Sequence, residues 1–279
     1  MKPARFDYER PTDLAEAVAL LGRDDIVVKA LAGGQSLGPM LNLRLVQPDL
    51  LVDITGLAEL KRVELADDAI VVGACVTHAD FEDGRVPDVT LGALPSVARA
   101  IAYRAVRNRG TIGGSLVHAD PSADWVSTLA AMGGQVLARG ALGVRSVPAD
   151  AFMTGVFEVA LEPGELLEAV RIPRLSPRAK WGYHKLCRKT GEFAHAIGAV
   201  LYDPERSVCR AVLGATESRP IVLADAHALF RGEPGAGLVA RLDLDVARAA
   251  LADAGMTDAL DVQTHLVALK RAVERADQK

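Results

Sequence analysis

The stretch VRNRGTIGGSLVHADPSAD, residues 106–124, decides how this chain is interpreted, because it places the paired glycines Gly113 and Gly114 directly before Ser115. Another pair, Gly33 and Gly34, stands earlier in the chain, in LAGGQS at residues 31–36; we call LAGGQS the first segment and TIGGS, residues 111–115, the second. Adjacent glycines are unfavourable inside regular elements, since glycine loses the most backbone freedom on folding. They are expected in a tight turn, against a close-packed neighbour, or around a bound anion such as phosphate.

Both segments have donors that suit a phosphate. These donors are the backbone N–H groups of Gly33, Gly34, Gln35 and residues 112–115, with the hydroxyls of Ser36 and Thr111. Neither segment has the GxGxxG pattern of a nicotinamide-binding Rossmann site or the GxxxxGK pattern of a P-loop, so both classes are poorly supported. For either segment alone, a tight turn between packed elements is the better explanation.

Charged residues surround the second segment. Arg104, Arg107 and Arg109 precede it, and Asp120 and Asp124 follow it. Carboxylates that accept hydrogen bonds from ribose or ribityl hydroxyls would suit a nucleotide-like cofactor held by a phosphate loop. Taken singly, the acids are equally suited to capping a helix or lying in its first turn, and the arginines to a solvated face.

Composition restricts the class of protein. The chain has 279 residues and a formal net charge of -4, which argues mildly against nucleic acid or an anionic membrane as partner. Its three cysteines, Cys75, Cys187 and Cys209, show no CxxC spacing and are expected to be reduced thiols. No apolar signal-peptide core and no membrane-spanning run is visible, so we expect a soluble, cytoplasmic protein.

Hydrophobic periodicity divides the chain into three units, residues 1–56, 57–165 and 166–279. The first is predicted as a helix beginning after Thr12 or Asp13, followed by two strands around the first glycine pair. The second mixes strands and helices, with one helix capped by Ser122 or Asp120. The third is predicted to begin with four strands, at 166–173, 180–186, 196–203 and 207–214, followed by helices. This order predicts an α+β unit with an antiparallel sheet and helices on one face.

Five segments together resemble the FAD-binding subunit of molybdenum hydroxylases, a family that includes the medium subunit of aerobic carbon monoxide dehydrogenase and the flavin domain of xanthine dehydrogenase. The segments are AGGQSLGPMLNLRLVQPDLLVDI, VGACVTH, VRNRGTIGGSLVHADPSAD, LEPGELLEAVRIP and YHKLCRKTGEFA. They follow the family's order and spacing from the N-terminus to about residue 200. The resemblance implies a two-subdomain FAD-binding domain of the vanillyl-alcohol-oxidase-like type (α+β and α/β), followed by a small α+β C-terminal domain.

The resemblance also implies a set of cofactor-binding residues. Two loops would hold the FAD pyrophosphate: Leu31, Ala32, Gly33, Gly34, Gln35, Ser36 and Leu37 in the first, and Thr111, Ile112, Gly113, Gly114 and Ser115 in the second. Asp124 matches a family FAD contact, and Lys185 matches the lysine of the Y-x-K pattern. Ile101 and Leu161 match positions against the flavin.

Three residues depart from the family pattern. Gln35 stands where histidine is frequent in the carbon monoxide enzymes, Ser115 where asparagine is usual, and Glu192 where aspartate is common. Ser115 keeps a hydroxyl, so phosphate or ribityl contact stays possible with a shorter reach. Gln35 weakens any claim that carbon monoxide is the substrate.

The resemblance implies an electron-transfer role in which a non-covalently bound flavin carries the redox chemistry and no conventional catalytic residue is needed. Lys185 would favour the anionic reduced flavin. His78, His118, His184 and His195 have no metal-site spacing and are interpreted as structural.

Three isolated cysteines cannot ligate two 2Fe–2S clusters, so the clusters and molybdopterin would lie on a small and a large partner subunit, in a dimer of heterotrimers. The alternatives are a stand-alone FAD-dependent oxidoreductase of related fold and a scaffold that has lost FAD. The substrate of the complex and the electron acceptor are not encoded in this chain.

Overall fold

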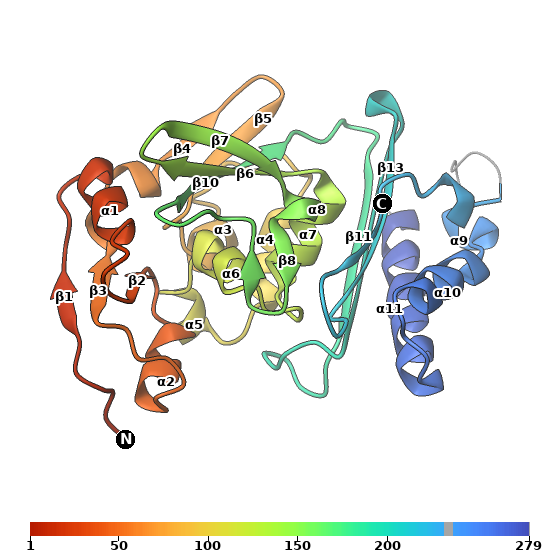
Figure 1. Ribbon diagram of the computed structural model, residues 1–279. Helices are drawn as coiled ribbons and strands as arrows, with labels where there is room; N and C mark the ends of the chain where they lie inside the picture. The colour runs from red at the N-terminus through yellow and green to blue at the C-terminus, as the bar shows by residue number, and fades with distance from the viewer. Residues whose placement is uncertain (232–236, 279) are drawn as a thin grey trace.

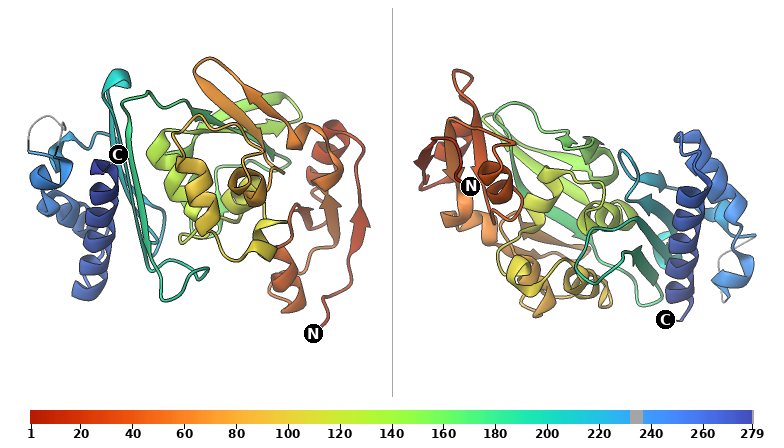
Figure 2. Two further views of the ribbon diagram at one scale, coloured as in Figure 1. Left: turned by 180° about the vertical axis from the view of Figure 1, so that it is seen from behind. Right: turned by 90° about the horizontal axis from the view of Figure 1, so that it is seen from below.

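The computed structural model describes residues 1–231 and 237–278, and these form three layers of structure that follow one another across the molecule (Figure 1). The N-terminal unit and the C-terminal helices lie at opposite ends, as the two further views show (Figure 2). A mixture of helices and sheets, with antiparallel sheets in the middle and at the C-terminal end, agrees with the predicted fold class.

The N-terminal unit is a small parallel sheet of order β1-β3-β2 with two helices. Its elements are β1 (Asp7–Glu9), α1 (Leu14–Leu21), β2 (Val28–Leu31), α2 (Leu37–Asn42) and β3 (Leu50–Asp53), with the 3-10 turns η1 (Ile54–Gly56) and η2 (Glu59–Lys61) after it. The predicted first helix is confirmed: the Asp13 side chain accepts from the Glu16 N–H, and the helix ends at Gly22. Strand β2 delivers the chain into the first glycine loop.

The middle unit is an antiparallel sheet of order β4-β5-β10-β6-β7, covered by helices. Its strands are β4 (Val63–Leu65), β5 (Ala69–Gly73), β6 (Gln135–Gly140), β7 (Gly143–Pro148) and β10 (Leu166–Pro173), with a two-stranded ribbon of β8 (Met153–Gly155) and β9 (Glu158–Val159). The helices are α3 (His78–Glu82), α4 (Ala93–Ala100), α5 (Arg104–Arg107), α6 (Ile112–His118), α7 (Asp124–Met132) and α8 (Ala149–Phe152).

The predicted strand at residues 166–173 belongs to a different sheet from the one expected. Residues 166–173 were expected to open the C-terminal sheet, but β10 is the central strand of the middle sheet and pairs with both β5 and β6. Its apolar run is compatible with either sheet, and only pairing with strands distant in sequence decides between them. Any boundary between the second and third units therefore has to be drawn after β10.

The C-terminal unit is an antiparallel sheet of order β11-β12-β13-β14 packed against helices. Its elements are β11 (Lys180–Leu186), β12 (Ala196–Asp203), η3 (Pro204–Arg206), β13 (Val208–Gly214), β14 (Ile221–Leu223), η4 (His227–Leu229), α9 (Leu238–Arg241), α10 (Leu244–Asp253) and α11 (Ala259–Asp277). Helix α11 lies directly on β11 and β12. The approach is so close that a β-carbon at Gly182 would collide with the helix backbone at Ala272, and one at Gly198 with the backbone at Ala268.

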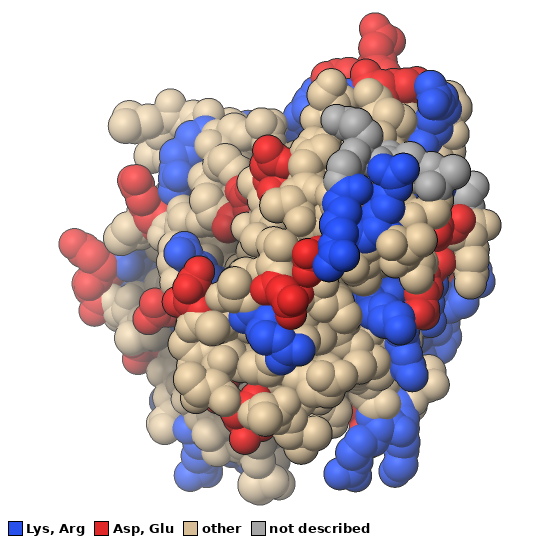
Figure 3. Space-filling view, turned by 90° about the vertical axis from the view of Figure 1, so that its right-hand side faces the viewer, with Lys and Arg blue, Asp and Glu red and all other residues tan. Residues whose placement is uncertain are grey.

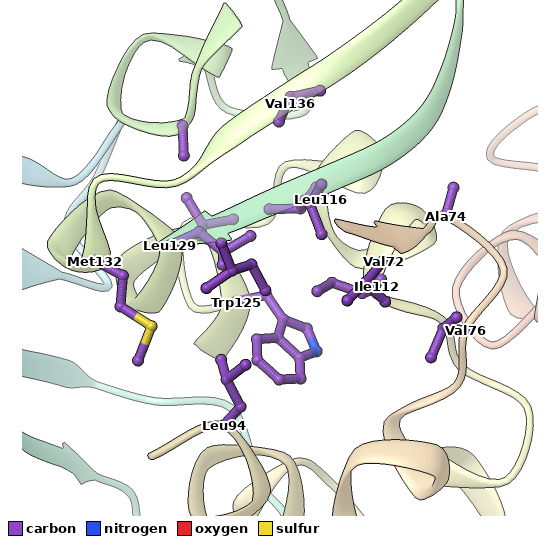
Figure 4. Packing of buried hydrophobic residues seen from close by; sticks show 14 of the residues in the cluster. Val72, Ala74, Val76, Leu94, Ile112, Leu116, Trp125, Leu129, Met132 and Val136 are labelled. Atoms are coloured by element: carbon purple, nitrogen blue, oxygen red, sulfur yellow. The ribbon is translucent and has the colours of Figure 1, made fainter. Parts of the chain in front are cut away.

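The hydrophobic core is divided between two clusters, one on each side of the C-terminal sheet. The larger cluster joins the N-terminal and middle units and reaches the inner face of that sheet. Trp125 of α7 is fully buried in it, and Figure 4 shows the ring lying between Leu94, Ile112 and Val76. The smaller cluster fills the space between the sheet and helices α9, α10 and α11. Helix α7 is therefore held between the middle sheet and the C-terminal sheet.

The surface over the C-terminal helices carries acidic and basic side chains in mixture (Figure 3). This mixture agrees with the net charge of -4. In the part of the chain that the structure describes, no helix is both long and apolar enough to cross a bilayer.

Candidate cofactor-binding site

The two glycine segments, far apart in the sequence, lie against each other in the fold. A β-carbon at Gly33 would collide with the carbonyl group of Arg109 and would lie 2.9 Å from the Cα atom of Gly110. The Arg109 side chain donates from Nε to the Gly33 carbonyl oxygen at 3.4 Å. Close backbone contact therefore explains Gly33, and the same contact places the ends of β2 and α5 at one site.

The first loop has a row of unpaired backbone donors. Gly34 has a φ of 71°, in the left-handed region that glycine tolerates best. Within the described residues, the N–H groups of Gly33, Gly34, Gln35 and Ser36 donate to no protein acceptor. Ser36 precedes α2, and its side chain makes no capping hydrogen bond. Consecutive unpaired N–H groups next to a left-handed residue form a concavity that suits an anion.

The Gln35 side chain does not extend from this loop. Its Nε2 donates to the Gly33 carbonyl oxygen at 3.2 Å, so the amide folds back over the turn. Gln35 therefore supports the loop conformation, and the departure from histidine leaves the row of free N–H groups intact.

The second segment is the first turn of helix α6, and its N–H groups are already paired. The Ile112 N–H donates to Val76 at 3.0 Å and the Gly113 N–H to Ala74 at 3.0 Å. The Gly114 N–H is capped by the Thr111 hydroxyl oxygen at 3.0 Å, and the Ser115 N–H donates to the Thr111 carbonyl at 3.0 Å. The expectation that these four amides would be free donors is wrong, because α6 begins against the end of β5.

Hydroxyl groups remain available at the start of α6. The Thr111 oxygen accepts from Gly114, so its hydrogen is free to be donated. Ser115 is half-buried, and its hydroxyl makes no hydrogen bond among the described residues. Gly114 itself is exposed, whereas Ile112 and Gly113 are buried. The exposed side of this turn is formed by Gly114 and the half-buried Ser115, whereas Thr111, which is 4% exposed, lies with Ile112 and Gly113 on the buried side.

Close packing explains two further glycines beside the loops. A β-carbon on Gly113 would lie 2.8 Å from the Ala74 Cα atom, and one on Gly110 would lie 2.8 Å from Nε2 of His78. His78 is buried and accepts from Trp125 Nε1 at 3.0 Å through its Nδ1. Burial and the nearby Arg107 lower the pKa of His78 to about 4. The imidazole is therefore neutral and fits the structural interpretation.

Asp124 and Lys185, separated by 61 residues, meet in a buried cluster. The Lys185 ammonium lies 3.0 Å from the Asp124 carboxylate, and the Tyr183 hydroxyl donates to Asp124 Oδ1 at 2.6 Å. Burial raises the pKa of Asp124 and outweighs the opposing effects of Lys185 and Tyr183. The pKa of Tyr183 is raised well above its ordinary value, chiefly by burial and then by the adjacent carboxylate.

The simpler interpretations of these residues hold only in part. The Lys185 side chain is only 10% exposed, so it is not a surface lysine. Asp124 does lie in the first turn of α7, but it is not the N-cap, which is Ala123, and no side chain caps this helix. Asp120 accepts from the Ser122 N–H at 2.8 Å in the preceding turn. The expectation that Ser122 or Asp120 caps the helix is therefore wrong, because the turn uses Asp120 locally.

The two remaining predicted positions lie at the margin of the main core. Ile101 follows the last turn of α4, and Leu161 follows β9; both are half-buried and pack against the larger cluster. Among the described residues, no hydrogen bond joins either position to the two loops. Each is half-exposed, as a side chain in contact with a cofactor ring would be.

Sequence reasoning missed the partners of Arg107. The arginines before the second segment, taken singly, were predicted to lie on a solvated face, but Arg107 is 9% exposed. Its Nε and Nη2 donate to the two carboxylate oxygens of Glu82 at 2.7 and 3.0 Å, and these bonds hold the pKa of Glu82 below its usual value. Glu82 lies 25 residues earlier, so no local spacing predicts the pair.

The described part of the chain offers no metal site, since no group of three or more His, Cys, Asp or Glu side chains could hold an ion there. Cys75 and Cys187 form no disulfide among the described residues, and burial raises the pKa of Cys75 to about 12. A thiol with such a pKa is inert at neutral pH.

Comparison with known proteins relates this chain to a family of FAD-binding domains. Residues 4–175 match the family model for the FAD binding domain in molybdopterin dehydrogenase. The chain is 39% identical over 201 residues to the carbon monoxide dehydrogenase medium chain of Hydrogenophaga pseudoflava, covering 72% of this chain and 70% of that one. It is 35% identical over 206 residues to the caffeine dehydrogenase subunit beta of Pseudomonas sp. strain CBB1, covering 74% and 70%.

Solved structures resemble the chain over its whole length. One is carbon monoxide dehydrogenase from Hydrogenophaga pseudoflava lacking the Mo-pyranopterin moiety of its cofactor, with a TM-score of 0.86, 33% identity, and coverage of 99% of this chain and 98% of that chain. Another is quinoline 2-oxidoreductase from Pseudomonas putida 86, with a TM-score of 0.85, 33% identity, and coverage of 100% and 99%. This similarity confirms the predicted fold class.

Proposed function

This chain belongs to the family of FAD-binding domains of molybdopterin dehydrogenases, and from that premise we propose that it passes electrons from a partner subunit to an external acceptor. It is the medium, FAD-binding subunit of a molybdenum hydroxylase of the carbon monoxide dehydrogenase type, and therefore an oxidoreductase component. The observation that supports the proposal best is the row of four N–H groups at residues 33–36 that have no acceptor among the described residues, beside the hydroxyl-bearing start of α6.

These groups fit the diphosphate of FAD. The first loop would supply backbone donors to the phosphate oxygens, and Thr111 and Ser115 would add hydroxyl donors from the facing helix. Gly114 would let the diphosphate approach the Thr111 hydroxyl, because a β-carbon at this position would lie 2.9 Å from that hydroxyl oxygen and obstruct it. No lysine or arginine is needed for this contact, because the charge is distributed over several dipoles.

Asp124 and Lys185 would act together toward the cofactor. Each Asp124 oxygen already accepts one hydrogen bond and keeps a lone pair for a ribityl hydroxyl. Lys185 would hold a positive charge near the ring and favour its anionic reduced form, although Asp124 compensates part of that charge. When bound, FAD supplies the redox chemistry itself. The chain's contribution is to bind, orient and exclude water, with Ile101 and Leu161 forming apolar contacts.

The rest of the electron path would lie on partner chains. Two 2Fe–2S clusters need more thiolates than three separated cysteines supply, and two of these, Cys75 and Cys209, are buried. We therefore propose a small subunit with the clusters, a large subunit with molybdopterin, and assembly as a dimer of heterotrimers. We propose a cytoplasmic location, because a reducing compartment would keep Cys75 and Cys187 as thiols.

The substrate is set outside this chain. The similar chains include a carbon monoxide dehydrogenase medium chain, a caffeine dehydrogenase subunit beta and a nicotine 6-hydroxylase medium subunit. Such a range of names among chains of similar sequence fits a subunit that receives electrons and does not bind the substrate.

The first test is the cofactor of the purified chain. We expect a yellow protein whose chromophore is released as free FAD on acid precipitation, because no histidine or cysteine stands in a flavin-attachment context. Native mass spectrometry of the chain expressed with its partners separates a subunit from a stand-alone flavoprotein. A colourless protein that FAD cannot reconstitute, or oxidation of an organic substrate by this chain alone, contradicts the proposed function.

A further inference from the structure

A buried arginine holds the turn that carries Ile101. The Arg107 guanidinium, in α5, donates from Nη1 to the carbonyl oxygens of Ile101 at 2.9 Å and Ala102 at 3.1 Å. Its other edge binds Glu82 of α3 through the two-bond fork already described. Because the guanidinium is planar and rigid, contacts at both edges fix the turn relative to α3 and α5.

The turn is held in a conformation that it would not adopt freely. Ala102 has a φ of 41°, in the left-handed region that residues with a β-carbon avoid. The two carbonyl oxygens that Arg107 binds belong to this residue and to the one before it. Such a conformation persists only where the surroundings impose it, and here Arg107 is the side chain that does so.

The same turn meets the loop that follows Lys185. Gly191 has a φ of 91°, and a β-carbon there would lie 2.9 Å from Cε1 of Tyr103 and 3.1 Å from the Ala102 carbonyl oxygen. The loop at residues 187–195 joins β11 to β12 of the C-terminal sheet. Turn 101–103 is therefore a junction between the middle unit and the C-terminal unit.

We propose that Arg107 and Glu82 are positioning residues for the flavin: they hold turn 101–103 so that Ile101 faces the ring and the loop at 187–195 packs against the turn. The inference rests on the proposed function, because Ile101 is assigned to the flavin by correspondence with the family. A purely structural pair would stabilise the contact between α3 and α5 and leave the flavin environment unchanged.

The test compares full-length variants by FAD affinity, by the visible spectrum of the bound flavin and by the melting temperature of the apoprotein. Arg107→Lys keeps the charge but cannot span Glu82 and two carbonyls, and Glu82→Gln removes the charged fork. Arg85→Lys is the matched control, since Arg85 binds Asp80 at 2.6 Å and Asp83 at 2.7 Å near α3 without touching the turn.

We expect Arg107→Lys and Glu82→Gln to weaken FAD binding about tenfold, because binding must then order a turn that is no longer fixed in advance, and to shift the flavin absorption bands. Arg85→Lys should bind FAD as the wild type does. Equal affinity and an identical spectrum in wild type, Arg107→Lys and Glu82→Gln would overturn the inference, whatever happens to the melting temperature.

A second variant covers the case in which the polar variants do not fold. Combining Arg107→Lys with Ala102→Gly removes the left-handed strain and so favours folding, while the turn loses the guanidinium that fixes it. We expect the FAD affinity of this double variant to fall several-fold; unchanged affinity and spectrum overturn the inference. A wild-type chain that binds no FAD overturns the proposed function, and the inference with it.

Discussion

The clearest test of the cofactor site is Gly114→Val, because this glycine is exposed and the fold does not require it. Gly114 lies in the first turn of α6, and the nearest atom to an added β-carbon is the Thr111 hydroxyl oxygen at 2.9 Å. Glycine is about 1 kcal/mol less favourable than alanine in a helix, and valine is about half as unfavourable, so the change in helix propensity stabilises the helix by about 0.5 kcal/mol. Displacing the Thr111 cap costs about 1 kcal/mol. The free energy of unfolding of the apoprotein should therefore change by about 1 kcal/mol or less.

The effect on FAD binding should be much larger. A branched side chain at this position would stand where the diphosphate approaches the Thr111 and Ser115 hydroxyls. Losing one or two charge-assisted hydrogen bonds, at about 1.5–3 kcal/mol each, corresponds to at least about a tenfold to hundredfold rise in Kd. The physical reason is local: the side chain blocks the ligand, whereas the helix behind it loses no more than the Thr111 cap.

The measurement pairs fluorescence titration of the apoprotein with FAD and thermal unfolding of the same samples. Ala105→Val, an exposed small residue in the neighbouring helix α5, controls for the added side chain. Gly113→Ala controls for packing, since its β-carbon would press on Ala74 and should lower the melting temperature. An unchanged Kd in Gly114→Val would refute the placement of the diphosphate at α6.

Two further predictions concern packing and the buried ion pair. Gly33→Ala should destabilise the apoprotein by about 1–3 kcal/mol in denaturant unfolding, because its β-carbon meets the Arg109 backbone, whereas Gly38→Ala, in open space, should not. Lys185→Met should lower the free energy of unfolding at neutral pH by about 3 kcal/mol by leaving the Asp124 charge unpaired, and the double variant with Asp124→Asn should recover most of the loss. In the wild type the pKa of Asp124 is raised, so its contribution to stability is full below the ordinary Asp pKa and declines as pH rises through the raised value. Lys185→Met should move this decline to higher pH. An unmoved profile in pH-dependent unfolding contradicts the pairing of Asp124 with Lys185.

Local patterns predicted most individual elements well. The helix capped by Asp13 and the strands at 180–186, 196–203 and 208–214 lie where the apolar spacing indicates, because a period of 3.6 or 2 identifies the buried face of each element. The same spacing could not assign residues 166–173 to a sheet. A strand that is buried on both faces has no polar side to show which neighbours it takes.

The site divides in the same way. The residues of both loops were identified from their glycines, but the glycines did not show which N–H groups are free. The amides at 33–36 are unpaired in the described structure, whereas those at 112–115 are paired by Ala74, Val76 and the Thr111 cap. Both segments contain a pair of adjacent glycines. Their N–H groups differ in pairing because the two segments pack against different neighbours.

The sequence alone thus determined the family, the cofactor class and the positions of the two loops, because these depend on residue types at short spacing: glycines that let backbone approach closely, and hydroxyls next to them. Only the tertiary structure decided which groups meet. Asp124 joins Lys185 across 61 residues, and Arg107 joins Glu82 across 25. These pairs form because burial leaves a charged group few partners, and folding brings them within hydrogen-bonding distance.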